Sequence, residues 1–178
     1  MNYVFFGTPK FAAIILEKLI NAEMPPVALV CNPDRPVGRK QIITPPETKS
    51  LVIRHQSLGI KVFQPKDPSL LMSSVSALMS DFFLVAAYAK ILPKEILEIP
   101  RLGTIGVHPS LLPKFRGPSP IQSAILAGEK ETGVTLYLMD EKMDHGPTLT
   151  KQKIDISSSS ANSYELADEL AEVSGKLL

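Results

Sequence analysis

The chain has 178 residues, of which 44% are hydrophobic and 21% are charged, and this length and balance suit one globular domain with a sizeable core. Its 19 basic and 18 acidic side chains give a net charge of +1, which excludes a generally polycationic protein, so any nucleic-acid surface must be local. The single cysteine, Cys31, excludes an intrachain disulfide framework, and we expect it to be a buried thiol after an apolar run. No signal-peptide pattern begins the chain and no apolar run approaches the ~20 residues of a membrane span, so we expect a cytoplasmic protein without a membrane partner.

Strands and helices are predicted to alternate through the first half of the chain. Residues 3–6 form a short aromatic and β-branched run, and apolar residues then recur at helical spacing from Phe11 to Ile20. Residues 27–31 are continuously apolar, which is typical of a strand covered on both faces, and a polar, proline-rich loop follows over residues 32–46. Next come predicted helices over residues 47–58, 68–79 and 94–98, and predicted strands over residues 60–64, 82–87 and 104–107.

The second half begins with a predicted helix over residues 121–127 and two strands over residues 134–139 and 149–156. A serine run, residues 157–160, is interpreted as a surface turn, after which Ser160 or Asn162 can cap the last helix. The apolar stripe of that helix consists of Tyr164, Leu166, Leu170, Val173 and Leu177.

This order of elements predicts an α/β fold, with a Rossmann-like, mostly parallel sheet, helices on both faces and a ligand crevice at the carboxyl ends of the strands. The turn at Gly7 lacks the further glycines of a dinucleotide fingerprint, and no Walker-type phosphate loop is present. Nucleotide binding by those two devices is therefore not supported.

A histidine, His108, stands where a predicted strand must stop pairing, because prolines and a glycine follow it. Imidazole exchanges protons near pH 7, and a carboxylate such as Asp144 on a second loop can orient it, so the two form a candidate acid/base pair. The alternative is a hydrogen-bonded structural histidine, and the separation in sequence leaves this open. His55 is expected at the surface, and His145 is interpreted as a loop residue, although it could titrate or contact substrate. No histidine, cysteine and carboxylate set has metal-ligand spacing, so no metal is predicted.

Two further segments are candidates for binding. Arg35, Arg39 and Lys40 lie in a loop with proline and glycine, where they could bind phosphates or remain solvated. The apolar strand that leads into residues 86–93 could form one wall of a flat heteroaromatic pocket, or it could be a strand end packed on its helix.

The motifs together resemble the folate-dependent formyltransferases, whose hallmark is Asn-x-His, Ser-Leu-Leu-Pro, Arg-Gly and a later Asp-x-Gly. This chain has His108, the run of residues 110–113, Arg116-Gly117 and Asp144-His145-Gly146. Residues 33–39, with Thr44-Pro45 and Lys49, are similar to a loop of the methionyl-tRNA formyltransferases that contacts the tRNA acceptor arm. The resemblance extends over almost the whole chain, from Phe6-Gly7-Thr8-Pro9 to the final helix.

The resemblance implies transfer of a formyl group from 10-formyltetrahydrofolate to the amino group of initiator methionyl-tRNA. His108 and Asp144 would be catalytic, and Arg35, Arg39, Lys40 and Lys49 would bind tRNA. The folate would be bound by Ser110, Leu111, Leu112, Pro113, Ala87, Tyr88, Ala89 and Ile91. Residues 1–178 would be the catalytic domain, without the family's C-terminal β-barrel.

One position departs from the family pattern, because Gly106 occupies the place of the asparagine two residues before His108. In the family that asparagine donates an amide hydrogen bond to the reacting oxygen, and loss of one such donor costs about 10²–10³ in turnover. We therefore expect slowed or lost activity. The alternatives are a formyltransferase acting on a small amine, such as a sugar nucleotide or glycinamide ribonucleotide, and an inactive folate- or RNA-binding module.

Overall fold

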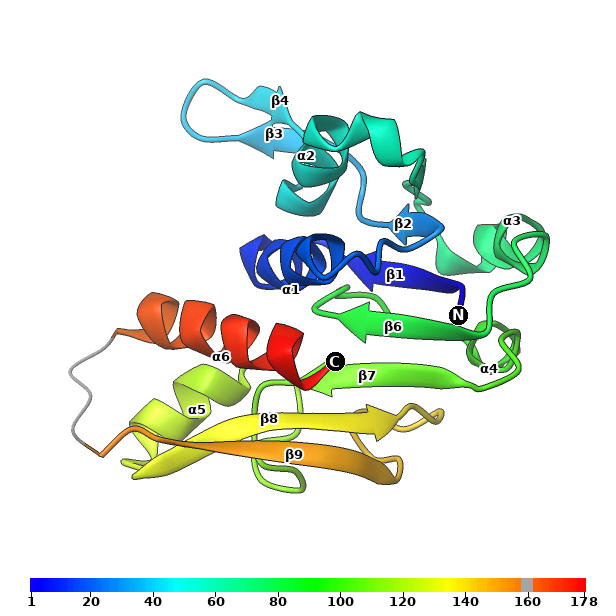
Figure 1. Cartoon of the computed structure of the whole chain (residues 1–178). Coiled ribbons are helices and arrows are strands. Elements are labelled where there is room, and N and C mark those ends of the chain that lie inside the picture. Colours follow the sequence, from blue (N-terminus) through cyan, green and yellow to red (C-terminus); the bar gives the residue numbers. More distant parts are fainter. Residues whose placement is uncertain (158–161) are drawn as a thin grey trace.

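The computed structural model describes residues 1–157 and 162–178 (Figure 1). Its strands are β1 (Tyr3–Gly7), β2 (Ala28–Val30), β3 (Arg35–Val37), β4 (Ile42–Thr44), β5 (Lys61–Phe63), β6 (Phe82–Ala86), β7 (Thr104–His108), β8 (Glu131–Leu138) and β9 (Thr148–Asp155). Its α-helices are α1 (Lys10–Asn21), α2 (Glu47–Arg54), α3 (Met72–Ser76), α4 (Lys94–Leu97), α5 (Pro120–Leu126) and α6 (Ser163–Leu177). Two short 3-10 helices are η1 (Gln56–Leu58) and η2 (Pro68–Leu71).

Seven strands form one sheet in the order β5-β2-β1-β6-β7-β8-β9. The first five of these run parallel to one another, whereas β8 pairs antiparallel with β7 and β9 pairs antiparallel with β8. The carboxyl ends of β1, β6 and β7 consequently lie at the same edge of the sheet (Figure 1). The prediction of a mostly parallel α/β sheet is confirmed.

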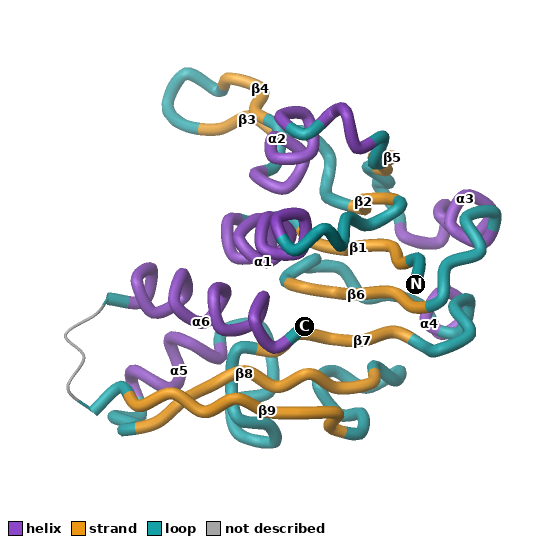
Figure 2. The backbone as a smooth tube through the Cα atoms, viewed as in Figure 1, coloured by secondary structure: helices purple, strands orange, loops and turns teal. Residues whose placement is uncertain are grey.

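Helices cover both faces of the sheet, and the alternation of side chains along each strand explains why (Figure 2). Phe5 and Leu84 belong to a core that includes residues of α1, α2 and α6, whereas Phe6 and Phe83 belong to a second core with residues of α3 and α4. Each central strand therefore buries both of its faces, as its continuous apolar sequence predicted. Cys31 is fully buried at the end of β2, as expected, and burial raises the pKa of its thiol to about 11.

The predicted loop over residues 32–46 contains a hairpin, because β3 and β4 pair with each other as a separate two-stranded sheet. All six of its strand residues are exposed, so the hairpin shows none of the alternation that marks a packed strand. The predicted helix over residues 47–58 breaks after Arg54 into η1, and the one over residues 68–79 divides into η2 and α3. Both predictions were too long.

Asn162 caps α6, since its side-chain oxygen accepts hydrogen bonds from the backbone amides of Tyr164 and Glu165. The alternative cap, Ser160, and residues 158–160 of the predicted serine turn lie outside the described residues. In the apolar stripe, Leu166 and Leu170 are buried, but Tyr164 is 82% exposed. Tyr164 was wrongly assigned to the stripe, because it precedes Leu166 by two residues and therefore lies on the opposite side of a helix with about 3.6 residues per turn. Within the part of the chain that the structure describes, no helix is long and apolar enough to cross a membrane.

Candidate active site

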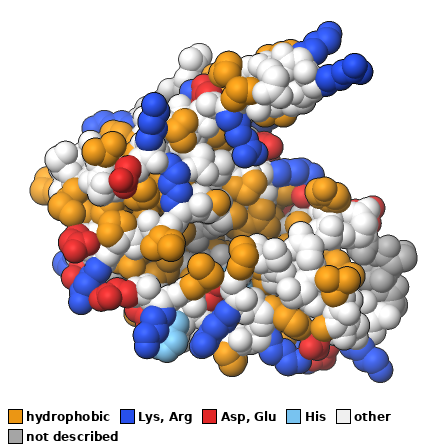
Figure 3. All heavy atoms as spheres, turned by 180° about the vertical axis from the view of Figure 1, so that it is seen from behind, with side chains coloured by type: hydrophobic (Ala, Val, Ile, Leu, Met, Phe, Trp, Pro, Cys, Tyr) orange, Lys and Arg blue, Asp and Glu red, His pale blue; other side chains and the backbone are white. Residues whose placement is uncertain are grey.

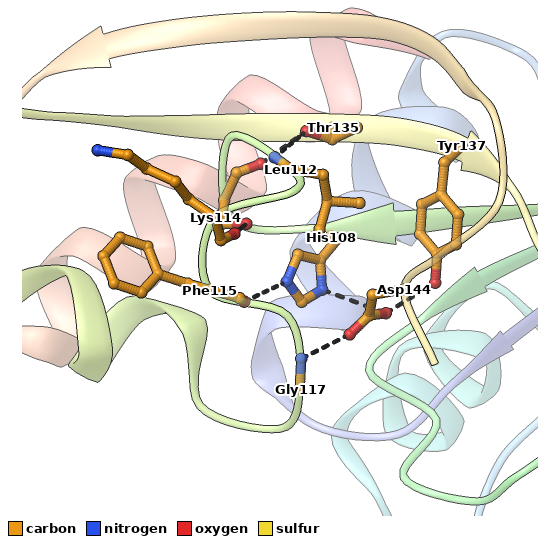
Figure 4. A network of polar contacts seen from close by, with 9 residues as sticks. His108, Leu112, Lys114, Phe115, Gly117, Thr135, Tyr137 and Asp144 are labelled. Atoms are coloured by element: carbon orange, nitrogen blue, oxygen red, sulfur yellow. Dashed lines mark hydrogen bonds and ion pairs between the residues drawn. The ribbon is translucent and has the colours of Figure 1, made fainter. Parts of the chain in front are cut away.

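His108 is the last residue of β7, and its side chain is held on both ring nitrogens (Figure 4). Ile105 and Val107 pack into the α1 and α6 core, so strand alternation turns His108 to the opposite face. The side chain is only 7% exposed, with Nε2 2.8 Å from the carbonyl oxygen of Phe115 and Nδ1 3.5 Å from Oδ1 of Asp144. The two residues of the candidate acid/base pair are therefore in contact.

Asp144 lies in the loop between β8 and β9, and the chain satisfies both of its carboxylate oxygens. Oδ1 accepts a hydrogen bond from the hydroxyl of Tyr137 at 2.8 Å, and Oδ2 accepts one from the backbone amide of Gly117 at 2.8 Å. Gly146 lets this loop fold back against β8, because a Cβ there would collide with the carbonyl oxygen of Leu138. The Asp-x-Gly motif thus provides the Asp144 carboxylate and, at Gly146, the close contact with the backbone of β8 that positions the loop.

The partners of His108 determine what its ring can do. The carbonyl of Phe115 can only accept, so Nε2 carries a hydrogen, and a second hydrogen on Nδ1 would point at the Asp144 carboxylate. The imidazolium form satisfies both partners. Both N–H groups then already have partners, so such a ring can stabilise an oxygen that is becoming negatively charged through its positive charge and through an N–H shared with, or released from, its present partner, and the nearby carboxylate can receive a proton.

Residues 110–117 fold back over β7, and backbone hydrogen bonds anchor the segment. The side-chain hydroxyl of Thr135 in β8 donates to the backbone carbonyl of Ser110 at 2.7 Å and accepts from the backbone amide of Leu112 at 3.1 Å. The side chains of Ser110 and Leu112 are buried, whereas Leu111 is half-buried and Pro113 is exposed. Of the four residues expected to bind folate here, Pro113 presents its side chain outward, Leu111 is half-buried with the tip of its side chain beside Gly133 of β8, and Ser110 and Leu112 support the loop from within.

The segment after β6 presents backbone rather than an aromatic ring. Ala87 and Ala89 are exposed, with φ of +48° and +62°, and Ile91 is 79% exposed. Tyr88, which the sequence suggested as part of a stacking wall, is 2% exposed and packs edge-on against Phe6 with ring centroids 5.5 Å apart. Its ring is therefore part of the core, and burial raises the pKa of its hydroxyl to about 12.

Unusual backbone conformations gather at these segments. Phe115 has φ of +55° and Asp144 has φ of +49°, in addition to the two alanines just described. Non-glycine residues adopt this left-handed region rarely, and where they do the surrounding structure must enforce it, often at a functional site.

The cationic residues predicted to bind tRNA fall into two groups. Arg35, Arg39 and Lys40 lie on the β3–β4 hairpin and are exposed. Figure 3 shows cationic side chains at the tip of this hairpin and a hollow with hydrophobic side chains below it. Lys49 of α2 is engaged within the chain, because its Nζ lies 2.8 Å from Oδ2 of Asp34 and 2.8 Å from Oε1 of Gln64.

Gly106 lies opposite Tyr137 in the antiparallel register of β7 and β8. Sequence reasoning identified Gly106 but missed Tyr137, as well as the backbone groups of Phe115 and Gly117 that bind His108 and Asp144. No short motif marks these residues, because their placement depends on strand register and loop path. In the sequence, Tyr137 could be noticed only as an aromatic residue within a predicted strand.

A separate hollow of about 710 Å³ lies at the other end of β7, and its lining includes Lys94, Arg101, Met139 and His145. His145 lies in the loop between β8 and β9, as expected; it is exposed, and its Nδ1 lies 2.7 Å from Oδ2 of Asp140. We place the candidate site at His108 instead, because proton-transfer groups from three separate segments converge there. In the described part of the chain, no three His, Cys, Asp or Glu side chains are grouped as a metal ion would require.

Comparison with known proteins identifies the family of the chain. The family model described as "Formyl transferase" matches residues 1–178. A methionyl-tRNA formyltransferase of Synechococcus sp. (strain JA-2-3B'a(2-13)) is 48% identical over 100% of this chain and 56% of its own length. The methionyl-tRNA formyltransferase of Bacillus subtilis (strain 168) is 44% identical over 98% of this chain and 55% of its own.

Solved structures agree on the fold. Glycinamide ribonucleotide transformylase 1 from Geobacillus kaustophilus matches with a TM-score of 0.76 over 99% of this chain and 93% of its own, at 23% identity. Phosphoribosylglycinamide formyltransferase from Bacillus halodurans matches with a TM-score of 0.75 at 22% identity, over 99% of this chain and 91% of its own. The chain thus spans a little over half the length of the curated relatives that it matches, and its whole length lies within one family model. On these grounds the chain belongs to the formyl transferase family.

Proposed function

We propose that the chain catalyses transfer of a formyl group from 10-formyltetrahydrofolate to the amino group of initiator methionyl-tRNA, in the cytoplasm. The observation that carries the proposal is the pairing of His108 with Asp144 at the carboxyl end of β7. The identity of 48% and 44% to two methionyl-tRNA formyltransferases supports the choice of amine.

His108 would act on the oxygen of the transferred group. When the amine attacks the formyl carbon, negative charge develops on that oxygen, and an imidazolium ring can stabilise it by its positive charge and by an N–H that is shared with, or released from, its present partner. The carbonyl of Phe115 and the carboxylate of Asp144 hold the ring in place for this role. Asp144 would also accept a proton from the attacking amine, and as the adduct collapses to the amide the bond from the formyl carbon to the folate nitrogen would break, with that nitrogen taking up a proton as it leaves.

The residues present fit a folate donor, which supplies the formyl group. Ala87 and Ala89 carry only methyl side chains, and their exposed backbone leaves peptide groups accessible to a flat, polar ring. Leu111 and Pro113 contribute apolar surface from the loop that also reaches His108 through Phe115. We assign the donor to these two segments, with Tyr88, Ser110 and Leu112 supporting them from within.

The exposed hairpin supports a nucleic-acid substrate. Arg35, Arg39 and Lys40 form no ion pair with a carboxylate in the described residues, so their charge is available to phosphates. Lys49 contributes less directly, because its ammonium is already bound by Asp34 and Gln64.

Formyl transfer to charged tRNA tests the proposal. The purified chain, supplied with 10-formyltetrahydrofolate, should produce formylmethionyl-tRNA from initiator methionyl-tRNA and should leave glycinamide ribonucleotide unmodified. A glycinamide product without tRNA formylation would instead assign the chain to the small-amine class represented by its structural relatives.

The variant His108→Ala should lower turnover by at least about 10²–10³, the usual cost of losing one donor to the reacting oxygen. Circular dichroism and the melting temperature should show that the variant remains folded. His108→Gln, which retains an amide donor, should keep part of the activity. Unchanged turnover in a folded His108→Ala variant would remove His108 from its role.

A further inference from the structure

The ring of Tyr137 fills the space beside Gly106. The two residues are directly opposite in the β7–β8 register, and side chains of such a pair point to the same face. A Cβ built on Gly106 would lie 2.5 Å from both Cε1 and Cζ of Tyr137 and 2.8 Å from its hydroxyl oxygen. Glycine is thus the residue that allows the phenol ring to lie flat across β7, next to His108.

The hydroxyl of this ring donates a hydrogen bond to Oδ1 of Asp144 at 2.8 Å (Figure 4). Burial raises the pKa of Tyr137 well above its usual range, and the charge of Asp144, the hydrogen bond to it and the charge of Asp140 act in the same direction. The phenol therefore stays protonated and serves as a donor. Because Gly117 binds the other oxygen, the carboxylate is fixed at both ends.

We propose that Tyr137 is a positioning residue for formyl transfer, acting on His108 through Asp144. Oδ1 of Asp144 faces both groups, and it is closer to the Tyr137 hydroxyl, at 2.8 Å, than to Nδ1 of His108, at 3.5 Å. The hydroxyl holds the carboxylate beside the imidazole and shares its negative charge. The proposal rests on the proposed function, since formyl transfer is one of its readouts.

The role of Gly106 follows from this arrangement. A side chain at position 106 and a tyrosine at position 137 exclude each other, so Gly106 is the permissive half of a pair. The hydroxyl of Tyr137 brings a polar group into the space that a residue at 106 would have entered. The space beside Gly106 is therefore filled by the ring and hydroxyl of Tyr137.

The variant Tyr137→Phe removes the hydroxyl and keeps the ring over Gly106. We expect kcat to fall by about tenfold or more, as for the loss of a hydrogen bond to a charged group, with KM for both substrates within about twofold. In an Asp144→Asn background the same change should have little further effect, because no carboxylate remains to be held. An equal loss in both backgrounds would show that the hydroxyl acts independently of Asp144 and would overturn the proposal.

A second readout needs no substrate and no activity. The NMR titration of the His108 ring, assigned with His55→Gln and His145→Gln variants, should move to higher pH in Tyr137→Phe. The reason is that the carboxylate then keeps more of its charge for the imidazolium. The Asp144→Asn and Asp144→Asn/Tyr137→Phe proteins should give coincident curves. An unchanged His108 curve in Tyr137→Phe would overturn the inference even in an active enzyme.

Tyr3 offers a matched control. Like Tyr137 it is a buried tyrosine on a strand, and its hydroxyl donates to the carbonyl of Met24 at 2.7 Å, away from the site. Tyr3→Phe should leave kcat and the His108 titration as in the wild type, and a change equal to that of Tyr137→Phe would overturn the proposal. If the wild-type chain transferred no formyl group while the His108 titration still responded to Tyr137→Phe, the proposed function would fail and the coupling through Asp144 would stand.

Discussion

Gly106 cannot accept a side chain without displacing its neighbour, and this changes what an asparagine at that position would do. We predict that Gly106→Asn destabilises the protein by about 1–3 kcal/mol, the usual cost of overpacking a filled site. The added Cβ would lie 2.5 Å from the ring of Tyr137, which is only 4% exposed and has no free space to enter. Urea unfolding of the two proteins measures the difference.

The double variant Gly106→Asn/Tyr137→Val supplies the control, because valine withdraws the ring from the space above Gly106. It should be more stable than the single Gly106→Asn variant. A Gly106→Asn protein as stable as the wild type, with faster formyl transfer, would contradict the close packing of Gly106 and Tyr137.

A cluster of polar side chains joins the loop before β3, helix α2 and the residue that follows β5. Asp34 follows β2, Lys49 belongs to α2 and Gln64 follows β5, and their side chains are mutually hydrogen-bonded at 2.8–2.9 Å. The bond from Lys49, followed by the bond from Gln64, holds the pKa of the Asp34 carboxyl below its usual value. The cluster ties the start of the β3–β4 hairpin to the sheet.

We predict that Asp34→Asn lowers stability at neutral pH and that this difference closes in acid. A carboxyl whose pKa is lowered by folding stabilises the protein above its ordinary pKa, near 3.9, and loses that contribution as the pH falls below it. Urea unfolding of wild type and variant between pH 7 and about pH 2, below the lowered pKa, measures the difference in unfolding free energy. In a Lys49→Gln background, which lacks the partner cation, Asp34→Asn should cost less stability at pH 7 than it does in the wild type. A gap independent of pH would rule out the ionised carboxylate as its cause.

At the scale of the whole molecule, the exposed cationic hairpin and the candidate active site lie in different places. The hairpin with Arg35, Arg39 and Lys40 projects beyond the sheet edge at which His108 lies (Figure 1). A long substrate could touch both regions at once. The net charge of +1 does not reveal that cations are concentrated on the hairpin.

We predict that Arg39→Ala/Lys40→Ala weakens tRNA binding and reduces the slope of its salt dependence by about one for each phosphate that is no longer neutralised. Turnover at saturating tRNA should change little, because neither residue touches His108 or Asp144. Binding measured over a range of KCl concentrations tests this. The control is Lys130→Ala/Lys153→Ala, which removes two cations near β8 and β9, and an equal decrease of salt dependence in that protein would refute a specific role for the hairpin.

Sequence alone predicted most of the scaffold, because the central strands are apolar on both faces and their sequence pattern has few alternatives. It missed the β3–β4 hairpin, whose residues are all exposed and therefore lack a burial pattern. It paired His108 with Asp144 as a hypothesis, from their chemistry and from the family resemblance, but the separation in sequence could not show that the two side chains meet. The contributions of Tyr137, Phe115 and Gly117 depend on β7–β8 register and on loop path, which no local pattern encodes.

The mutual exclusion at positions 106 and 137 also constrains the order in which mutations can accumulate. A lineage in which residue 106 carries a side chain must shrink that residue before a tyrosine can be accommodated at 137, and a lineage like this one must first lose the aromatic ring. Each of these first mutations produces a protein that has neither a side chain at position 106 nor an aromatic ring at position 137. Substitutions at these two sites should therefore be strongly epistatic, and a reconstructed ancestor with one change but not the other would be a poorer enzyme than either endpoint.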